Sequence, residues 1–189
     1  MKSLHILIVY NGRLPVSKYG GTQRVIWSLG KELAGMGHRV TFLAGEGSHC
    51  DFAGVRILDH SKPVSGQIPE DVDLVHSFIN IWEELPKPLM VTIEGNSRPG
   101  RDFHINTCFV SGNHASRYGS EVYVYNGMDL DELGKPHLDL ERKYLHFLGK
   151  AAWNVKNVKG CINIAREAGI PLRVLGGNRI NLKMGLRIT

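Results

Sequence analysis

The sequence has few of the features that mark secreted or membrane proteins. Its three cysteines, Cys50, Cys108 and Cys161, are far apart and odd in number, so disulfides are not expected. The apolar segment HILIVY at 5–10 is followed directly by Asn, Gly and Arg, which makes it too short for a signal peptide or a membrane span. These absences favour a cytoplasmic protein with reduced thiols.

Three common ligand-binding motifs are missing as well. Gly12 is separated from Gly20 by a gap of seven residues, so the fingerprint G-x-G-x-x-G is absent, and so is the phosphate loop G-x-x-x-x-G-K-[ST]. Neither a nicotinamide cofactor nor ATP is therefore favoured. The nine histidines show no H-x-x-x-H or Cys/His ligand spacing, so no metal site is predicted.

The charge is weakly basic and evenly spread. A net charge of +5 suits an anionic partner such as a phosphorylated ligand or an acidic membrane face. No basic run is interleaved with aromatic residues, so nucleic-acid binding is not expected. The apolar share of 42% and the charged share of 22% are those of an ordinary globular protein.

Apolar runs and helical spacing alternate along the first two thirds of the chain. Apolar residues at helical spacing predict a helix over 22–36 that ends at Gly37, and a short helix is predicted to begin at Asn113. Short apolar runs predict strands at 5–10, 39–45, 55–60, 73–78, 89–95, 107–112 and 122–127. Strands that alternate with helices indicate an α/β fold with a doubly wound, Rossmann-like parallel sheet over residues 1–129.

The composition changes after this domain. Residues 130–143 are charged, contain Pro136 and are predicted to be a linker. Residues 144–189 contain a strand at 144–149, an amphipathic helix and a second strand at 172–177. This single βαβ unit is too small to enclose its own core, so we expect the chain to stop inside a second domain.

Two adjacent glycines, Gly20 and Gly21, stand between the first predicted strand and the first predicted helix. A glycine turn at this place exposes backbone N–H groups and the positive end of the helix dipole at the carboxyl edge of the sheet. The pattern therefore suits a phosphate group. The alternative is that the two glycines only form a tight turn into the helix.

Five segments in the same order resemble one enzyme family. They are YGGTQRVIWSLGKELAGMGHRVTFLA, DLVHSF, FVSGNHASRYG, VYVYNGMDLDEL and FLGKAAWNVKNVKGCINIAREAG. Together they are similar to the retaining glycosyltransferases of family four, which have the GT-B architecture. The resemblance implies two Rossmann-like domains that face each other across a cleft, with the acceptor on the N-terminal domain and a nucleotide-diphosphate sugar on the C-terminal one. It implies no metal requirement, and the acceptor is a glycan or a lipid-linked molecule.

The resemblance assigns roles to two groups of residues. Gly20, Gly21 and Thr22 match the loop that lies beside the donor's diphosphate, where a Cβ would block close approach. Lys150 stands where the family usually has Arg, and Lys156 matches the family's second basic residue. Both would stabilise the charge that builds on the leaving diphosphate, although Lys150 lacks the bidentate fork of Arg. The alternative is that both lysines are ordinary surface charges.

Four further residues match positions near the transferred sugar. Asn126 and Gly127 would line the cleft, or else form a plain turn. Glu94 occupies a place where many relatives carry His, and its carboxylate can accept a hydrogen bond from a sugar hydroxyl. His76 also matches a family position, with a structural role as the alternative. Glu94 and His76 are kept as candidate catalytic residues.

A pair of glutamates separated by seven residues holds the donor in the family, and these 189 residues contain no such pair. We therefore expect a truncated or naturally shortened glycosyltransferase that shows no sugar transfer by itself. Two other interpretations stay open. The chain is a non-catalytic acceptor-binding subunit that needs a partner's donor domain, or it is an unrelated doubly wound domain. Peripheral contact with the inner face of a membrane also stays open.

The apolar strands and helix of residues 144–189 lack partners, and exposed strand edges recruit other strands. This segment could join the first domain's sheet, remain disordered or pair with its copy in a second chain. We predict a homodimer through residues 144–189, because such pairing satisfies both the edge hydrogen bonds and the apolar face. Light scattering should give a dimer for the 189-residue chain and a monomer for a chain cut after Arg142. Monomeric masses for both would contradict the prediction.

Overall fold

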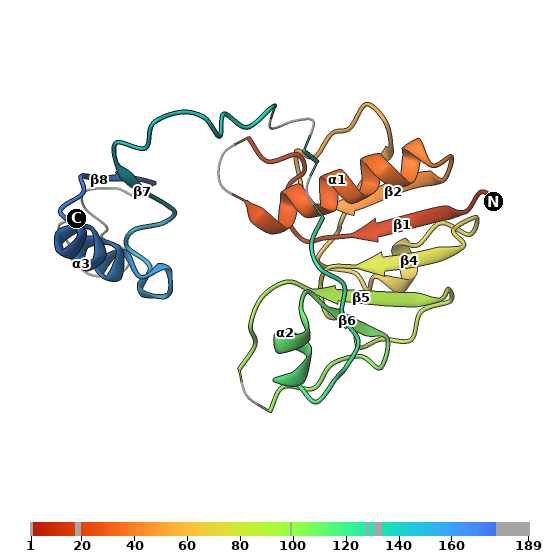
Figure 1. Ribbon diagram of the computed structural model, residues 1–189. Coiled ribbons are helices and arrows are strands. Elements are labelled where there is room, and N and C mark those ends of the chain that lie inside the picture. Colours follow the sequence, from red (N-terminus) through yellow and green to blue (C-terminus); the bar gives the residue numbers. More distant parts are fainter. Residues whose placement is uncertain (1, 18–19, 99, 128, 131–133, 177–189) are drawn as a thin grey trace. The chain divides into compact units, whose positions relative to one another are not determined.

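The computed structural model describes residues 2–17, 20–98, 100–127, 129–130 and 134–176, and the chain divides into two compact units, Met1–Leu133 and Gly134–Thr189 (Figure 1). The first unit contains a six-stranded parallel sheet with the order β3-β2-β1-β4-β5-β6. The α/β fold with a Rossmann-like sheet is thus confirmed. The strands are β1 (His5–Val9), β2 (Arg39–Ala44), β3 (Gly54–Ile57), β4 (Leu74–Ser77), β5 (Leu89–Ile93) and β6 (Thr107–Phe109).

The two faces of this sheet carry different cores, because successive side chains of a strand point to opposite faces. Ile6 and Ile8 of β1 pack with Ile26 of helix α1 (Gly21–Gly35) on one face. Leu7 and Val9 belong to the other face. That second core is the larger one and joins Val75 and its neighbours with residues of the connecting loops.

An aromatic cluster holds helix α1 against one face of the sheet. Phe42 of β2 is fully buried and stacks on Trp27 of α1, with a ring-centroid distance of 5.9 Å. Phe52 packs edge-on against Trp27 at 4.8 Å. The Phe42 ring fills the place where Gly30 has no side chain, since a Cβ on Gly30 would lie 2.4 Å from Cζ of Phe42. Gly30 thus lets the helix approach the sheet closely.

The predicted strand at 122–127 is wrong. Tyr123 is joined to Phe109 only by an isolated parallel bridge. Phe109 makes one backbone hydrogen bond to the residue before Tyr123 and one to the residue after it. The neighbouring strand β6 has three residues and offers no longer ladder. All of residues 122–127 are exposed, so their alternating apolar residues gain no burial from a strand.

The predicted alternation of strands and helices holds at α1 but not along the whole sheet. Among the described residues, the connections from β2 to β6 contain only the 3-10 turn η1 (Ser65–Gln67). Proline and glycine recur in these connections and disfavour helix. The short helix expected from Asn113 is α2 (Gly112–Ser116), which begins one residue earlier because the Ser111 side chain caps it by accepting from His114 N–H.

The second unit contains a two-stranded parallel sheet and one helix. Its elements are β7 (Leu145–Leu148), the 3-10 turn η3 (Asn154–Lys156), α3 (Val158–Ala168) and β8 (Leu172–Leu175). Large apolar side chains on these elements are exposed, among them Leu148 and Ile164. Residues 134–143 of the predicted linker carry no helix or strand. The last residue of the strand predicted at 172–177, and the rest of the segment to 189, lie outside the described residues.

The Gly30 contact gives a test within one helix. Replacing Gly30→Ala should lower the free energy of unfolding by about 1 to 3 kcal/mol, because the buried Phe42 ring has no room to move. Gly35→Ala, in the same helix with nothing within 4 Å of its Cβ, should raise it by about 0.5 to 1 kcal/mol. Urea unfolding followed by tryptophan fluorescence measures both. Equal shifts in the same direction would contradict the packing explanation.

Candidate functional site

Several predicted site residues follow strands whose carboxyl ends lie at one edge of the sheet, where ligands bind in open α/β folds. The loop with Gly20 leads from β1 into α1, and Glu94 follows β5 directly. Asn126 reaches Glu94 from the segment after α2. The parallel sheet therefore gathers these residues on its carboxyl side (Figure 1).

The N-terminus of α1 is open. Gly20 is the N-cap residue and no side chain caps the helix. In the described part of the chain, a Cβ on Gly21 would have no atom within 4 Å, whereas one on Gly20 would lie 2.7 Å from Oε1 of Gln23. The described packing therefore gives no reason for a glycine at position 21, and at position 20 the closest contact is the flexible end of Gln23, which can move aside. Thr22 is half-buried in the first turn, which contains no acidic residue.

Glu94 and Asn126 form a polar pair at the carboxyl edge. Nδ2 of Asn126 donates to Oε2 of Glu94 at 2.9 Å. The other oxygen, Oε1, is buried and has no hydrogen-bond partner among the described residues. Burial raises the pKa of the Glu94 carboxyl, and the hydrogen bond from Asn126 partly opposes this rise. One carboxylate oxygen is therefore left to accept a hydrogen bond from a ligand hydroxyl.

His114 is a residue that the sequence reasoning missed. Its side chain is 6% exposed, and neither ring nitrogen has a hydrogen-bond partner in the described part of the chain. The ring lies edge-on to Phe109 and Tyr118, at 5.0 and 5.5 Å. Burial lowers the pKa of His114, an effect that the nearby backbone of Gly95 partly offsets. The signal in the sequence was a histidine at the start of a short helix after a buried strand.

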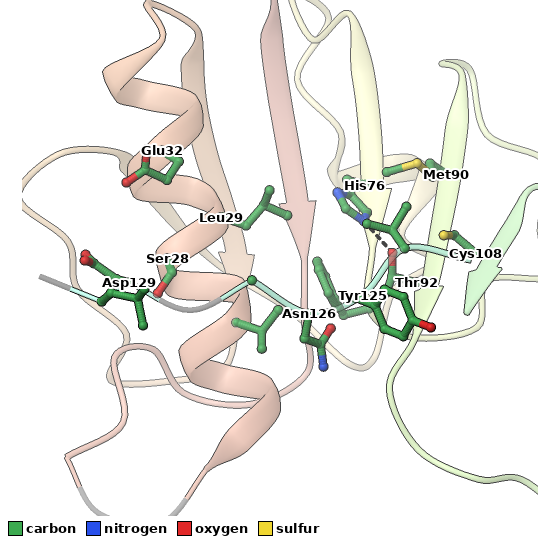
Figure 2. A pocket seen from close by; sticks show the side chains of 15 residues that line it. Ser28, Leu29, Glu32, His76, Met90, Thr92, Cys108, Tyr125, Asn126 and Asp129 are labelled. Carbon is green, nitrogen blue, oxygen red and sulfur yellow. Dashed lines mark hydrogen bonds between the residues drawn. The ribbon is translucent and has the colours of Figure 1, made fainter. Parts of the chain in front are cut away.

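A cavity of about 680 Å³ lies between α1 and the sheet, and we call it the sheet cavity (Figure 2). Ser28, Leu29 and Glu32 line it from the helix, and Met90 and Cys108 from the strands. The complete lining consists of Val25, Ser28, Leu29, Glu32, His76, Phe78, Met90, Thr92, Cys108, Val124, Tyr125, Asn126, Gly127, Asp129 and Leu130. It includes three of the predicted site residues: His76, Asn126 and Gly127.

His76 lies on the sheet side of this cavity. Its Nε2 is 2.8 Å from Oγ1 of Thr92 on the neighbouring strand, and its ring stacks on Phe78 at 4.6 Å. The residue is 7% exposed. Burial lowers the pKa of His76 to about 4, so the ring is neutral at pH 7. A neutral imidazole can donate one hydrogen bond and accept another, so it can bind or position a ligand, but it is not the charged imidazolium that would serve as an acid at this pH.

The two candidate lysines belong to the second unit, on the loop between β7 and α3. Lys150 follows Gly149, and its ammonium lies 4.4 Å from the ring centroid of Trp153, a cation–π contact. A Cβ on Gly149 would lie 3.9 Å from Cγ of Lys156, so both lysines border the same loop. Asn157 caps α3 by accepting from Gly160 N–H. Lys150 and Lys156 thus lie on the same loop of the second unit.

No model of a known protein family and no curated protein matches this chain. Within the described ranges, no three His, Cys, Asp or Glu side chains are grouped so that they could hold a metal ion. None of the described helices is both long enough and apolar enough to cross a bilayer.

The burial of His76 predicts that the free energy of unfolding depends on pH. Its folded pKa of about 4 lies below the ordinary 6.5, so the unfolded chain takes up the proton first as the pH falls. The free energy of unfolding should therefore fall by up to about 3 kcal/mol between pH 6.5 and 4. His76→Phe should reduce this fall, whereas Thr92→Val, which leaves the imidazole in place, should largely keep it. Urea unfolding at several pH values measures the effect, and an NMR titration midpoint of His76 near 6.5 would contradict it.

Proposed function

We propose that this chain is the N-terminal part of a retaining GT-B glycosyltransferase that moves a sugar from a nucleotide-diphosphate sugar to a glycan or lipid-linked acceptor. The observation that carries the proposal is the open start of α1 at Gly21, where the protein's own packing does not require a glycine. A ligand that must come close to the backbone supplies the missing reason. The ordered sequence resemblance names that ligand as the donor's diphosphate.

The loop of the second unit that carries Lys150 and Lys156 supports the same chemistry. Lys150 and Lys156 would stabilise the negative charge that grows on the diphosphate as the sugar leaves. The ring of Trp153 lies against the Lys150 ammonium and restricts it, which makes up in part for the fork geometry that an Arg would provide. We propose that these lysines supply the positive charge without a metal ion.

Glu94 suits contact with the transferred sugar. Its buried Oε1 has no partner within the described residues, and a sugar hydroxyl would provide the hydrogen bond. Asn126 holds the carboxylate in place through the other oxygen. We propose that Glu94 positions the sugar, in an enzyme that works in the cytoplasm or at the inner face of a membrane. A calorimetric titration of the longest available form with a panel of nucleotide sugars tests donor binding.

The first prediction concerns Lys156 in a form that carries the complete donor domain. Lys156→Ala should raise the barrier to transfer by about 2 to 4 kcal/mol, which lowers turnover about 30- to 1000-fold. Donor affinity should fall much less, because the charge on the leaving group grows in the transition state. Lys159→Ala, an exposed lysine in the first turn of α3, serves as the matched control. Unchanged turnover for Lys156→Ala would make this lysine an ordinary surface charge.

The second prediction concerns Gly21 in the same form. Gly21→Asp should abolish transfer, because it places a carboxylate where the phosphate binds. The domain should still fold, since the Cβ meets open space and an acidic residue suits the start of a helix. Gly35→Asp, at the other end of α1, controls for the added charge. Transfer rates and circular dichroism of both variants decide the matter, and retained transfer by Gly21→Asp would refute the phosphate loop.

A further inference from the structure

The sheet cavity exists because α1 covers only part of its face of the sheet. The helix packs on β1 and β2, where Ile8 and Phe42 meet it. On β4, β5 and β6 the side chains of the same face are left beside the helix, and they form one wall of the cavity (Figure 2). Residues 124–127, 129 and 130 supply the remaining wall. A volume of about 680 Å³ falls within the range of small-molecule sites.

Most of the cavity wall is apolar. Helix α1 contributes Val25 and Leu29, and β5 contributes Met90. Val124 and Tyr125 form part of the outer wall and are themselves 68% and 69% exposed, so apolar surface continues to the rim. When an apolar ligand displaces water from a surface of this kind, the free energy falls, so binding is favoured.

One polar group on the wall is incompletely hydrogen-bonded. Nε2 of His76 bonds to Oγ1 of Thr92, but Nδ1 has no hydrogen-bond partner among the described residues, although His76 is only 7% exposed. Figure 2 shows this second ring nitrogen turned away from Thr92. A ligand group that can both donate and accept, such as a hydroxyl, would satisfy Nδ1 in either tautomer.

The charges around the cavity disfavour an anionic ligand. The imidazole is neutral at pH 7 and offers no charge to pair with. The ionisable residues that line the cavity besides His76 and Cys108 are Glu32, Asp129 and Tyr125. Asp129 is bound to Lys31 at 2.8 Å, whereas Glu32 is exposed. A carboxylate or phosphate inside the cavity would therefore lose hydration and gain no cation from the lining.

We propose that the sheet cavity is a binding site for an uncharged, mainly apolar molecule that carries a hydroxyl group, with the hydroxyl bound to Nδ1 of His76. The proposal does not rest on sugar transfer, because the ligand is recognised by the cavity wall and not by the loops that carry Gly21 and Lys156, although His76 is also one of the residues predicted near the transferred sugar. Asn126 and Gly127 lie on its rim and also belong to the predicted cleft. A ligand in the cavity would thus touch the edge of that cleft.

The test uses the 189-residue chain and a fluorescent apolar probe, N-phenyl-1-naphthylamine. The probe should bind with increased fluorescence, and 1-octanol should displace it. Octanoate at pH 7 has the same tail length but carries a charge, and it should bind at least tenfold more weakly. No displacement by 1-octanol, or equal affinities for the alcohol and the carboxylate, would overturn the proposal.

Two variants locate the binding. Val124→Trp fills the cavity from its exposed outer wall and should abolish probe binding, whereas Val122→Trp, two residues away and outside the lining, should leave it unchanged. His76→Phe should weaken 1-octanol about 3- to 10-fold, the value of one hydrogen bond, without affecting the probe. Equal loss in both tryptophan variants would overturn the assignment. If no probe binds and Val124→Trp instead changes the mass in light scattering, this face is a protein contact and the proposal fails.

Discussion

The parallel pairing of six strands is the constraint on which the rest of the first unit depends. It brings the carboxyl ends of β1, β4 and β5 to one edge, so residues that are far apart in the sequence become neighbours. The central strands β1 and β2 contribute to both cores, whereas β4, β5 and β6 contribute only to the larger one. Because α1 is the only long helix described on its face, the sheet has a cavity beside that helix as well as a candidate site at its edge.

The strands and α1 could be predicted because their sequence patterns report burial directly. The run at 5–10 is apolar apart from His5 because β1 is buried on both faces, and the spacing in α1 reports one buried side. The segment 122–127 shows where this reasoning fails. Its Val and Tyr residues suit a strand, but the pattern carries no information on whether a neighbouring strand is long enough to pair with it.

The candidate site could be predicted in part. Glu94 stands directly after a strand and Gly20 at the start of a helix, and both kinds of position can be read along the chain. Three-dimensional relations could not be read in this way. The bond between Asn126 and Glu94 joins residues 32 positions apart. The rings against His114 come from nearby in the sequence, but no local pattern tells that both of its ring nitrogens lack a hydrogen-bond partner within the described residues. His76 resembles a site residue in the sequence, while its surroundings are set by the neighbouring strand.

The contact between Gly30 and the Phe42 ring fixes the position of α1 on the sheet. The Phe42 ring fits only where the helix has no side chain, so the helix can neither slide nor rotate by one residue without a collision. Gly21 lies nine residues earlier, about 13 Å along the helix axis. The place of the glycine turn relative to the sheet edge is therefore set by a contact far from any ligand. Positions 30 and 42 thus form a size-complementary pair: a larger residue at one position fits only with a smaller residue at the other.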